Sequence, residues 1–117
     1  MPAAKLDITI EQGATFSQSF IIKAGSPPVP VDLTGYTARM QIRPDVKSQT
    51  IIASASTTDG KIIIEPIDGK LTITFEATET ASFVGDSGRY DLEIESPSGF
   101  VTRLIQGKVK ISPEVTR

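Results

Sequence analysis

The stretch that decides the fold class is Asp86-Ser-Gly-Arg-Tyr-Asp-Leu92. Asp86, Gly88 and Tyr90 have the Asp-x-Gly-x-Tyr spacing of the tyrosine corner, in which a tyrosine near the start of a strand bonds back to upstream backbone. Leu92 stands two residues after the tyrosine, where antibody domains carry a core cysteine, so apolar packing can fill that position without a disulfide. Asp86, Gly88 and Tyr90 therefore predict a structural corner in an immunoglobulin-like sandwich.

Alternation of apolar and polar residues extends this interpretation along the chain. A period of two is typical of strands with one buried face. It predicts eight strands, over residues 6–11, 16–23, 37–43, 51–55, 61–65, 71–75, 90–94 and 100–111. The last one changes phase near Gly107, which indicates a β-bulge. We expect an all-β, antiparallel two-sheet β-sandwich, immunoglobulin-like or with a jelly-roll strand order, in a single domain spanning residues 1–117.

Turn-forming residues separate the predicted strands. Asp59-Gly60 and Asp68-Gly69 are hairpin signals, because glycine accepts positive φ without steric cost. The proline-rich segment Gly25-Ser-Pro-Pro-Val-Pro30 cannot donate to a central ladder and predicts a loop that crosses between the sheets. One short helix is predicted over Ala77–Phe83, with one of its two threonines near its start.

Composition excludes several classes of function. The 117 residues contain no cysteine, histidine or tryptophan, so disulfides, thiolate ligands and imidazole catalysis are all absent. Twelve basic and fourteen acidic residues give a net charge of −2, without the basic excess of a nucleic-acid-binding domain. No apolar run is long enough to span a membrane, and no secretory leader follows Met1. We expect a cytoplasmically made chain, complete from its own methionine, without a cofactor, a nucleic-acid partner or a membrane partner.

Paired carboxylates are the nearest approach to a catalytic or metal-binding pattern. Asp91, Glu93 and Glu95 alternate with Tyr90, Leu92 and Ile94, so their side chains point away from the core. Three like charges on a solvated strand face are ordinary, and the chain has no calcium-loop spacing of acidic residues. Serine or threonine nucleophiles also lack an obvious base. These patterns predict no catalytic residue, no metal site and no enzyme.

Arginine positions offer a candidate binding surface. The basic residues on polar strand positions are Arg39, Arg43, Arg103, Lys108 and Lys110. Their simplest role is to keep the strands soluble and to protect sheet edges. Arg39, Arg43 and Arg103 could instead line a partner interface, because arginine is enriched over lysine at such interfaces.

Two loops are further candidates for partner binding. Pro27, Pro28 and Pro30 stiffen the segment Ala24–Pro30, which then loses little conformational entropy when a partner orders it. The segment Asp45–Thr50 is the second loop predicted to reach a partner. A free edge strand could also be extended by a strand of another chain.

Three parts of the sequence resemble small structural proteins of tailed bacteriophages and prophages. They are Glu11–Phe16, Val31–Pro44, and Ser96–Gly99 followed by Val101–Arg103 and Ser112–Arg117. The order Gly-x-Thr-Phe, Asp-Leu-Thr-Gly and an alternating strand is also similar to the N-terminal immunoglobulin-like domain of phage baseplate upper proteins. The resemblance implies a virion protein made in the bacterial host cytoplasm, which docks on other phage structural proteins and forms a homo-oligomer.

Several functional alternatives stay open at this point. The likeness to the baseplate domain favours the tail or baseplate, and a capsid-decorating protein of the phage head is the alternative within the same class. A carbohydrate-binding module on the same sandwich is a different class. Such modules stack sugars on exposed aromatic rings, and this chain has seven aromatic residues (five Phe and two Tyr), most of them at positions predicted to face the core.

Overall fold

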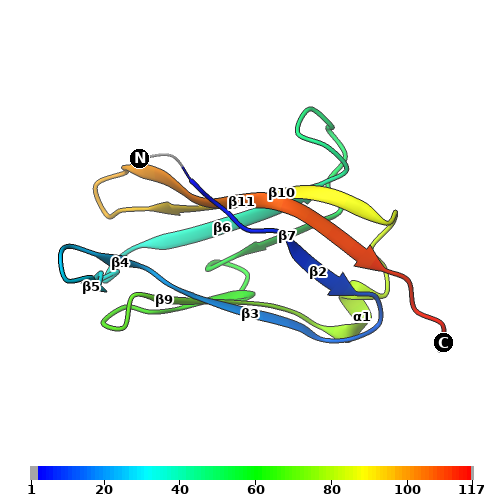
Figure 1. The fold of residues 1–117 in the computed structure, drawn as a ribbon, viewed down its shortest axis with the longest axis horizontal. Coiled ribbons are helices and arrows are strands. Elements are labelled where there is room, and N and C mark those ends of the chain that lie inside the picture. The colour runs from blue at the N-terminus through cyan, green and yellow to red at the C-terminus, as the bar shows by residue number, and fades with distance from the viewer. Residues whose placement is uncertain (1–2, 117) are drawn as a thin grey trace.

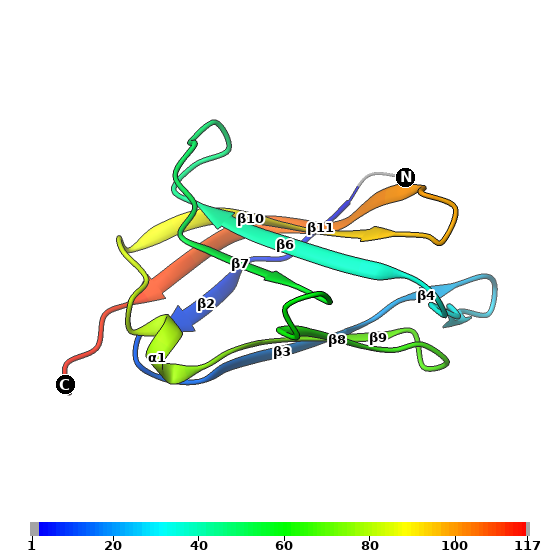
Figure 2. The ribbon, with the colours of Figure 1, turned by 180° about the vertical axis from the view of Figure 1, so that it is seen from behind.

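Two β-sheets packed face to face form the body of the molecule. The computed structural model describes residues 3–116. The six-stranded sheet contains β1 (Ala4–Lys5), β2 (Ile8–Glu11), β6 (Thr37–Arg43), β7 (Ala53–Ser56), β10 (Ser87–Glu95) and β11 (Val101–Ser112). The three-stranded sheet contains β3 (Phe16–Ile21), β8 (Ile62–Glu65) and β9 (Lys70–Phe75). Figures 1 and 2 show the two layers from opposite sides. The predicted β-sandwich is confirmed.

The strand order is immunoglobulin-like. The large sheet runs β1-β11-β10-β6-β7, with β2 also paired to β11, and the small sheet runs β3-β9-β8. These orders match the G-F-C-C′ and B-E-D sheets of that fold, which distinguishes it from the jelly roll. The sandwich is not antiparallel throughout, because β1 and β2 both pair with β11 in parallel. The predicted strand over residues 6–11 is split at Leu6 and Asp7.

The interior is filled by the apolar residues of the alternating pattern. Ile42, Leu92 and Phe75 have no exposed surface and come from both sheets. Phe83 closes one end, where its ring packs edge-on against Phe75 with centroids 5.4 Å apart. Leu6 departs from the expected pattern, since it is 41% exposed while Ile8 and Ile10 are buried.

The proline-rich segment forms a short hairpin, and the predicted crossing between the sheets at residues 25–30 is wrong, because Val31 still donates its N–H to the Ile22 carbonyl beside the small sheet. β4 (Lys23–Ala24) pairs with β5 (Val29–Pro30) in a separate two-stranded sheet. Pro30 is compatible with this position because a strand at a sheet edge does not need every N–H for a ladder. With β1 and β2 divided, the described residues form eleven strands instead of the predicted eight.

The two Asp-Gly turns have different roles. Asp68-Gly69 lies in the antiparallel hairpin of β8 and β9, where Glu65 pairs with Lys70. Asp59-Gly60 instead leads from β7 in the large sheet to β8 in the small one, so the hairpin expected there is wrong. Asp59 Oδ1 accepts the N–H groups of Ser56 and Lys61 at 3.0 and 2.9 Å, which turns the chain across the sandwich.

The helix is shorter than predicted and begins differently. α1 spans Ala77–Thr80, and the expected extension to Phe83 is wrong. Its first turn is closed by Glu76 and Glu79, since the Glu76 N–H donates to Glu79 Oε1 at 3.0 Å. Thr80 does not cap the helix; its buried side chain connects the helix to residues 13 and 14. Its hydroxyl donates to the Ala14 carbonyl at 2.8 Å and accepts the Gly13 N–H at 3.0 Å.

The irregularity of β11 lies at Leu104, not at Gly107 as predicted. Leu92 of β10 pairs with Ile105 and Glu93 pairs with Arg103, so Leu104 is the extra residue. Gly107 is required for another reason. A Cβ there would overlap the Leu6 carbonyl oxygen and lie 2.7 Å from the Leu6 carbonyl carbon. The glycine therefore lets the junction between β1 and β2 pass close to β11.

Tyr90 forms a hydrogen bond to the same junction between β1 and β2. Its hydroxyl donates to the Leu6 carbonyl oxygen at 2.6 Å, so the bond reaches the N-terminal segment and not the backbone just before the tyrosine. Burial, and secondarily the negative charge of Asp7, raise the pKa of Tyr90 to about 12. At Gly88 a Cβ would lie 2.7 Å from the Arg43 carbonyl oxygen, and the Asp86 carbonyl accepts the Ile111 N–H at 2.9 Å.

Candidate functional site

The outer face of the six-stranded sheet gathers positive charge on an acidic protein. Alternation along the strands turns seven of the twelve basic residues to this face, together with four of the fourteen acidic ones. The basic residues are Lys5, Arg39, Arg43, Arg89, Arg103, Lys108 and Lys110, and the acidic ones are Glu11, Asp91, Glu93 and Glu95. We call this surface the cationic face. Its charge is opposite in sign to the net charge of −2 of the whole chain.

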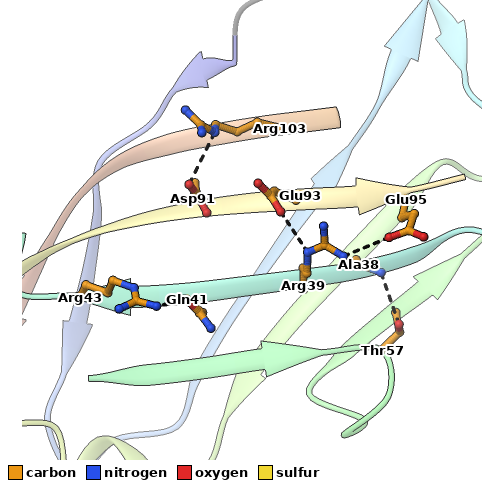
Figure 3. A network of polar contacts seen from close by, with 9 residues as sticks. All are labelled: Ala38, Arg39, Gln41, Arg43, Thr57, Asp91, Glu93, Glu95 and Arg103. Carbon is orange, nitrogen blue, oxygen red and sulfur yellow. Dashed lines mark hydrogen bonds and ion pairs between the residues drawn. The ribbon is translucent and has the colours of Figure 1, made fainter. Parts of the chain in front are cut away.

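One cross-strand row of the cationic face is electrostatically compensated. Glu93 of β10 lies between Arg39 of β6 and Arg103 of β11. Arg39 donates from Nε to Glu93 Oε1 at 2.9 Å and from Nη1 to Glu95 Oε1 at 3.1 Å (Figure 3). These two carboxylates, Glu93 first, raise the pKa of Arg39 above its ordinary value. We call Arg39, Glu93 and Arg103 the mixed row.

A second row on the same strands contains no carboxylate. Arg89 of β10 is paired with Arg43 of β6 on one side and with Lys108 of β11 on the other. Within residues 3–116, none of these three side chains forms an ion pair with a carboxylate. Arg43 instead donates to two neutral oxygens, the Ser48 carbonyl and Gln41 Oε1, both at 2.8 Å. We call Arg43, Arg89 and Lys108 the cationic row.

A shallow groove of about 590 Å³ runs along the cationic row. Lys5 and Asp7 form its wall on the N-terminal side, and Asp45 and Val46 form the opposite wall. Val46 is 79% exposed and gives that rim an apolar surface. The Arg43–Ser48 hydrogen bond holds the second wall against the sheet.

The acidic residues in the groove are largely committed to the fold. Asp7 Oδ1 accepts the Lys108 N–H at 2.9 Å, and Asp45 Oδ1 accepts the Lys47 N–H at 2.8 Å. Asp91 lies 3.5 Å from Arg103, between its Oδ2 and the guanidinium Nε (Figure 3). Burial and the charge of Glu93 raise the pKa of Asp91, although Arg103 and Arg43 oppose this shift. The groove thus has unpaired cations but few free carboxylates.

The structure brings some of the predicted partner-binding residues together and separates others. Arg43 and Arg103 line the groove, and the predicted Asp45–Thr50 loop supplies one of its walls. Arg39 lies outside it, beside Glu93 and Glu95. The segment of Pro27, Pro28 and Pro30 lies at the opposite end of the molecule from the 45–50 loop (Figures 1 and 2). The prolines therefore do not share a site with the groove arginines.

Arg89 and Lys5 are the residues of this face that the sequence interpretation missed. Arg89 belongs to the corner stretch, where the tyrosine dominates the pattern, although its polar position on the strand was a usable signal. Lys5 reaches the face because β1 pairs with β11, placing it beside Gln106. That pairing has no local sequence signal.

Residues 3–116 contain neither a cluster of metal-ligating side chains nor a helix long enough to span a membrane. Among residues 3–116, no group of three or more acidic, histidine or cysteine side chains is placed to hold a metal ion. The one described helix is too short to cross a membrane. What the cationic face can do chemically is bind negatively charged groups through arginine and lysine donors.

Comparison with known proteins identifies a similar structure but no sequence family. No family model matches the chain, and no curated protein matches it. The fold is similar to the N-terminal domain of phage TP901-1 ORF48. That likeness covers 92% of this chain and 94% of the other, with a TM-score of 0.53 and 8% sequence identity. In total 393 chains of known structure match, so the architecture is widely shared and does not by itself specify a function.

Proposed function

We propose that this protein is a non-enzymatic structural component of a tailed bacteriophage particle, on the tail or baseplate side. It acts by docking on other virion proteins through the cationic face. The observation that carries the proposal is the shared fold with a domain of ORF48, a phage baseplate protein, over nearly the full length of both chains. The cationic face supplies a binding surface that this fold alone would not require.

The mechanism is presentation of a rigid surface in many copies. The filled core fixes β6, β10 and β11, so the arginines and lysines of the cationic face are held in one arrangement before binding. A preorganised surface loses little entropy when a partner binds. If symmetry places several copies on one particle and the copies associate with each other, weak single contacts add up to stable attachment.

Purified phage particles from the strain that encodes the chain provide the test. Quantitative mass spectrometry should find the protein at about six or about twelve copies per particle, as the ring symmetry of a tail allows. The major capsid protein, counted in the same spectra, calibrates the copy number. A count on the order of hundreds would indicate capsid decoration instead. Absence of the protein from purified particles would refute the virion role altogether.

A further inference from the structure

We propose that the groove along the cationic row binds an extended acidic segment of a partner protein, with its carboxylates on Arg43, Arg89 and Lys108. This inference rests on the proposed function and names the chemistry of the partner. The site is assembled from three strands and two flanking segments, and Arg89 occupies its centre.

The cationic row is unfavourable for the isolated protein. Like charges directly opposite each other on neighbouring strands destabilise a sheet. Arg43, Arg89 and Lys108 form two such contacts in succession, and no carboxylate of residues 3–116 is ion-paired with any of them. Places where a fold breaks such a local rule are expected to be functional. A negatively charged partner would remove the repulsion on binding.

The spacing of the row suits an extended peptide. Neighbouring strands lie about 4.8 Å apart, so the three cations span roughly 10 Å across the sheet. In an extended chain, side chains on one face are about 7 Å apart. A segment that crosses the strands with acidic residues at alternate positions can therefore place two carboxylates on the row. Val46 on the rim adds an apolar contact for the residues between them.

The same groove argues against a nucleic acid as the occupant. Three carboxylates, those of Asp7, Asp45 and Asp91, line it among the cations. A phosphate backbone places a negative charge at every nucleotide and would pass close to them. A peptide can keep neutral residues opposite those carboxylates, so its charges can match the row alone.

Fluorescence anisotropy on the purified full chain tests the inference. The probe is a fluorescein-labelled peptide of about nine residues, long enough to cross the strands, in which aspartate alternates with glycine. Two comparison probes are the same peptide with asparagine for aspartate and an oligo-dT of about eight nucleotides, within the site size of single-strand binders. At about 50 mM NaCl, where screening is modest, the acidic peptide should bind and the asparagine peptide should not.

Single-residue variants test whether the acidic peptide binds at the cationic row. Arg89→Glu should weaken the acidic peptide at least about tenfold, which corresponds to roughly 1.4 kcal/mol. Arg89→Gln should weaken it less, and because Arg89 is exposed both variants should fold. Lys23→Glu is the matched control, since it makes the same change in net charge at an exposed lysine on β4, far from the groove in sequence and in sheet. It should change the affinity less than about twofold, because long-range effects are screened.

Four results of the anisotropy measurements would overturn the inference. They are no binding of the acidic peptide, equal binding of the asparagine peptide, equal weakening by Arg89→Glu and Lys23→Glu, and tighter binding of oligo-dT than of the peptide. Failure of the proposed function looks different, because the protein would then be missing from purified particles whatever the peptide does. If Arg89→Glu is incorporated into particles at the wild-type copy number while the peptide no longer binds, the groove is not the docking site.

Discussion

The mixed row and the cationic row lie on the same three strands and differ in how charge is balanced. Arg39, Glu93 and Arg103 alternate in sign across β6, β10 and β11. Four residues further along β6, about 13 Å away at the usual rise per residue, Arg43 faces Arg89, which faces Lys108. Each row has two exposed residues and one half-buried residue, and the extra residue of β11 lies between the rows, so the contrast lies in which side chains the register brings together.

This contrast distinguishes charged side chains that stabilise the sheet from charged side chains that are available to bind a partner. In the mixed row Arg39 is held by one hydrogen bond to Glu93 and by a second to Glu95, which lies next to the row. In the cationic row, the guanidinium of Arg43 donates its hydrogen bonds to neutral oxygens. Its positive charge therefore stays available to a negatively charged partner. The first row therefore contributes to the fold, whereas the second maintains an electrostatic potential outside it.

The largest expected effect comes from Gly107, which lets the wall of the groove approach β11. Gly107→Ala should lower the free energy of unfolding by about 3 kcal/mol, because the new methyl group overlaps the Leu6 backbone. In NMR spectra the shift changes should concentrate at residues 4–8 and 105–109 beside the cationic row. Resonances around Arg39 and Glu95, beside the mixed row, should move little.

Gly60→Ala is the control for the loss of a glycine. Gly60 has φ of +82°, and an added Cβ there would meet nothing within 4 Å, so the variant tests conformational strain without a clash. Its cost should be about 1 kcal/mol. If Gly107→Ala and Gly60→Ala unfolded at the same urea concentration, the backbone at Leu6 would have moved to accommodate the new methyl group at little cost. The wall of the groove would then not be rigid.

The layered fold could be predicted from sequence, because it depends on local patterns. The alternation around Tyr90, Leu92 and Ile94 and the buried residues of β6 indicated strands and core faces that the structure confirms. The hairpin expected at Asp59-Gly60 failed for a non-local reason. Those residues look like a hairpin turn, but whether the next strand returns to the same sheet depends on pairing with β9.

The cationic row could not be predicted, because it depends on register. Its three residues meet only when β6, β10 and β11 are aligned, and the extra residue at Leu104 places Lys108 instead of Gly107 opposite Arg89. The phase change in the sequence had indicated a bulge at Gly107 instead. Arg43 and Arg103 were recognised by residue type, whereas Arg89 becomes notable only through its two neighbours across the sheet.

A smaller effect is expected from removing the Tyr90 hydroxyl. Tyr90→Phe loosens the same wall without adding bulk, and it leaves the Leu6 carbonyl without its 2.6 Å hydrogen bond. We expect a loss of about 1 kcal/mol at neutral pH. If the groove depends on this wall, the variant should also bind the acidic peptide less tightly while the mixed row is unaffected.

The pH dependence of this variant sharpens the assignment. Because the folded state raises the pKa of Tyr90 from 10.0 to about 12, it favours the neutral phenol. The resulting stability is complete below pH 10 and is lost as the pH rises toward 12. The stability difference between wild type and Tyr90→Phe should therefore shrink over that range. A difference that stays constant from about pH 9 to about pH 12 would show that the phenol is not held in a buried, protonated state.

The smallest effects should differ in sign between the two rows. Arg39→Ala removes both hydrogen bonds to Glu93 and Glu95, and we expect a loss of about 0.5 kcal/mol because the pair is exposed. Arg89→Ala removes the central charge of the cationic row, and we expect no loss or a gain of about 0.3 kcal/mol from relief of repulsion. Urea unfolding at low and high salt measures both.

Salt distinguishes charge effects from loss of side-chain packing. Screening should weaken the attraction around Arg39 and the repulsion around Arg89 alike, so both changes in stability should approach zero as salt is raised. A loss that persists at high salt would report packing of the arginine stem instead. If Arg89→Ala destabilises the protein as much as Arg39→Ala at low salt, then the cationic row carries no strain. Its residues would then need no partner to explain them, and the difference between the two rows would have no functional meaning.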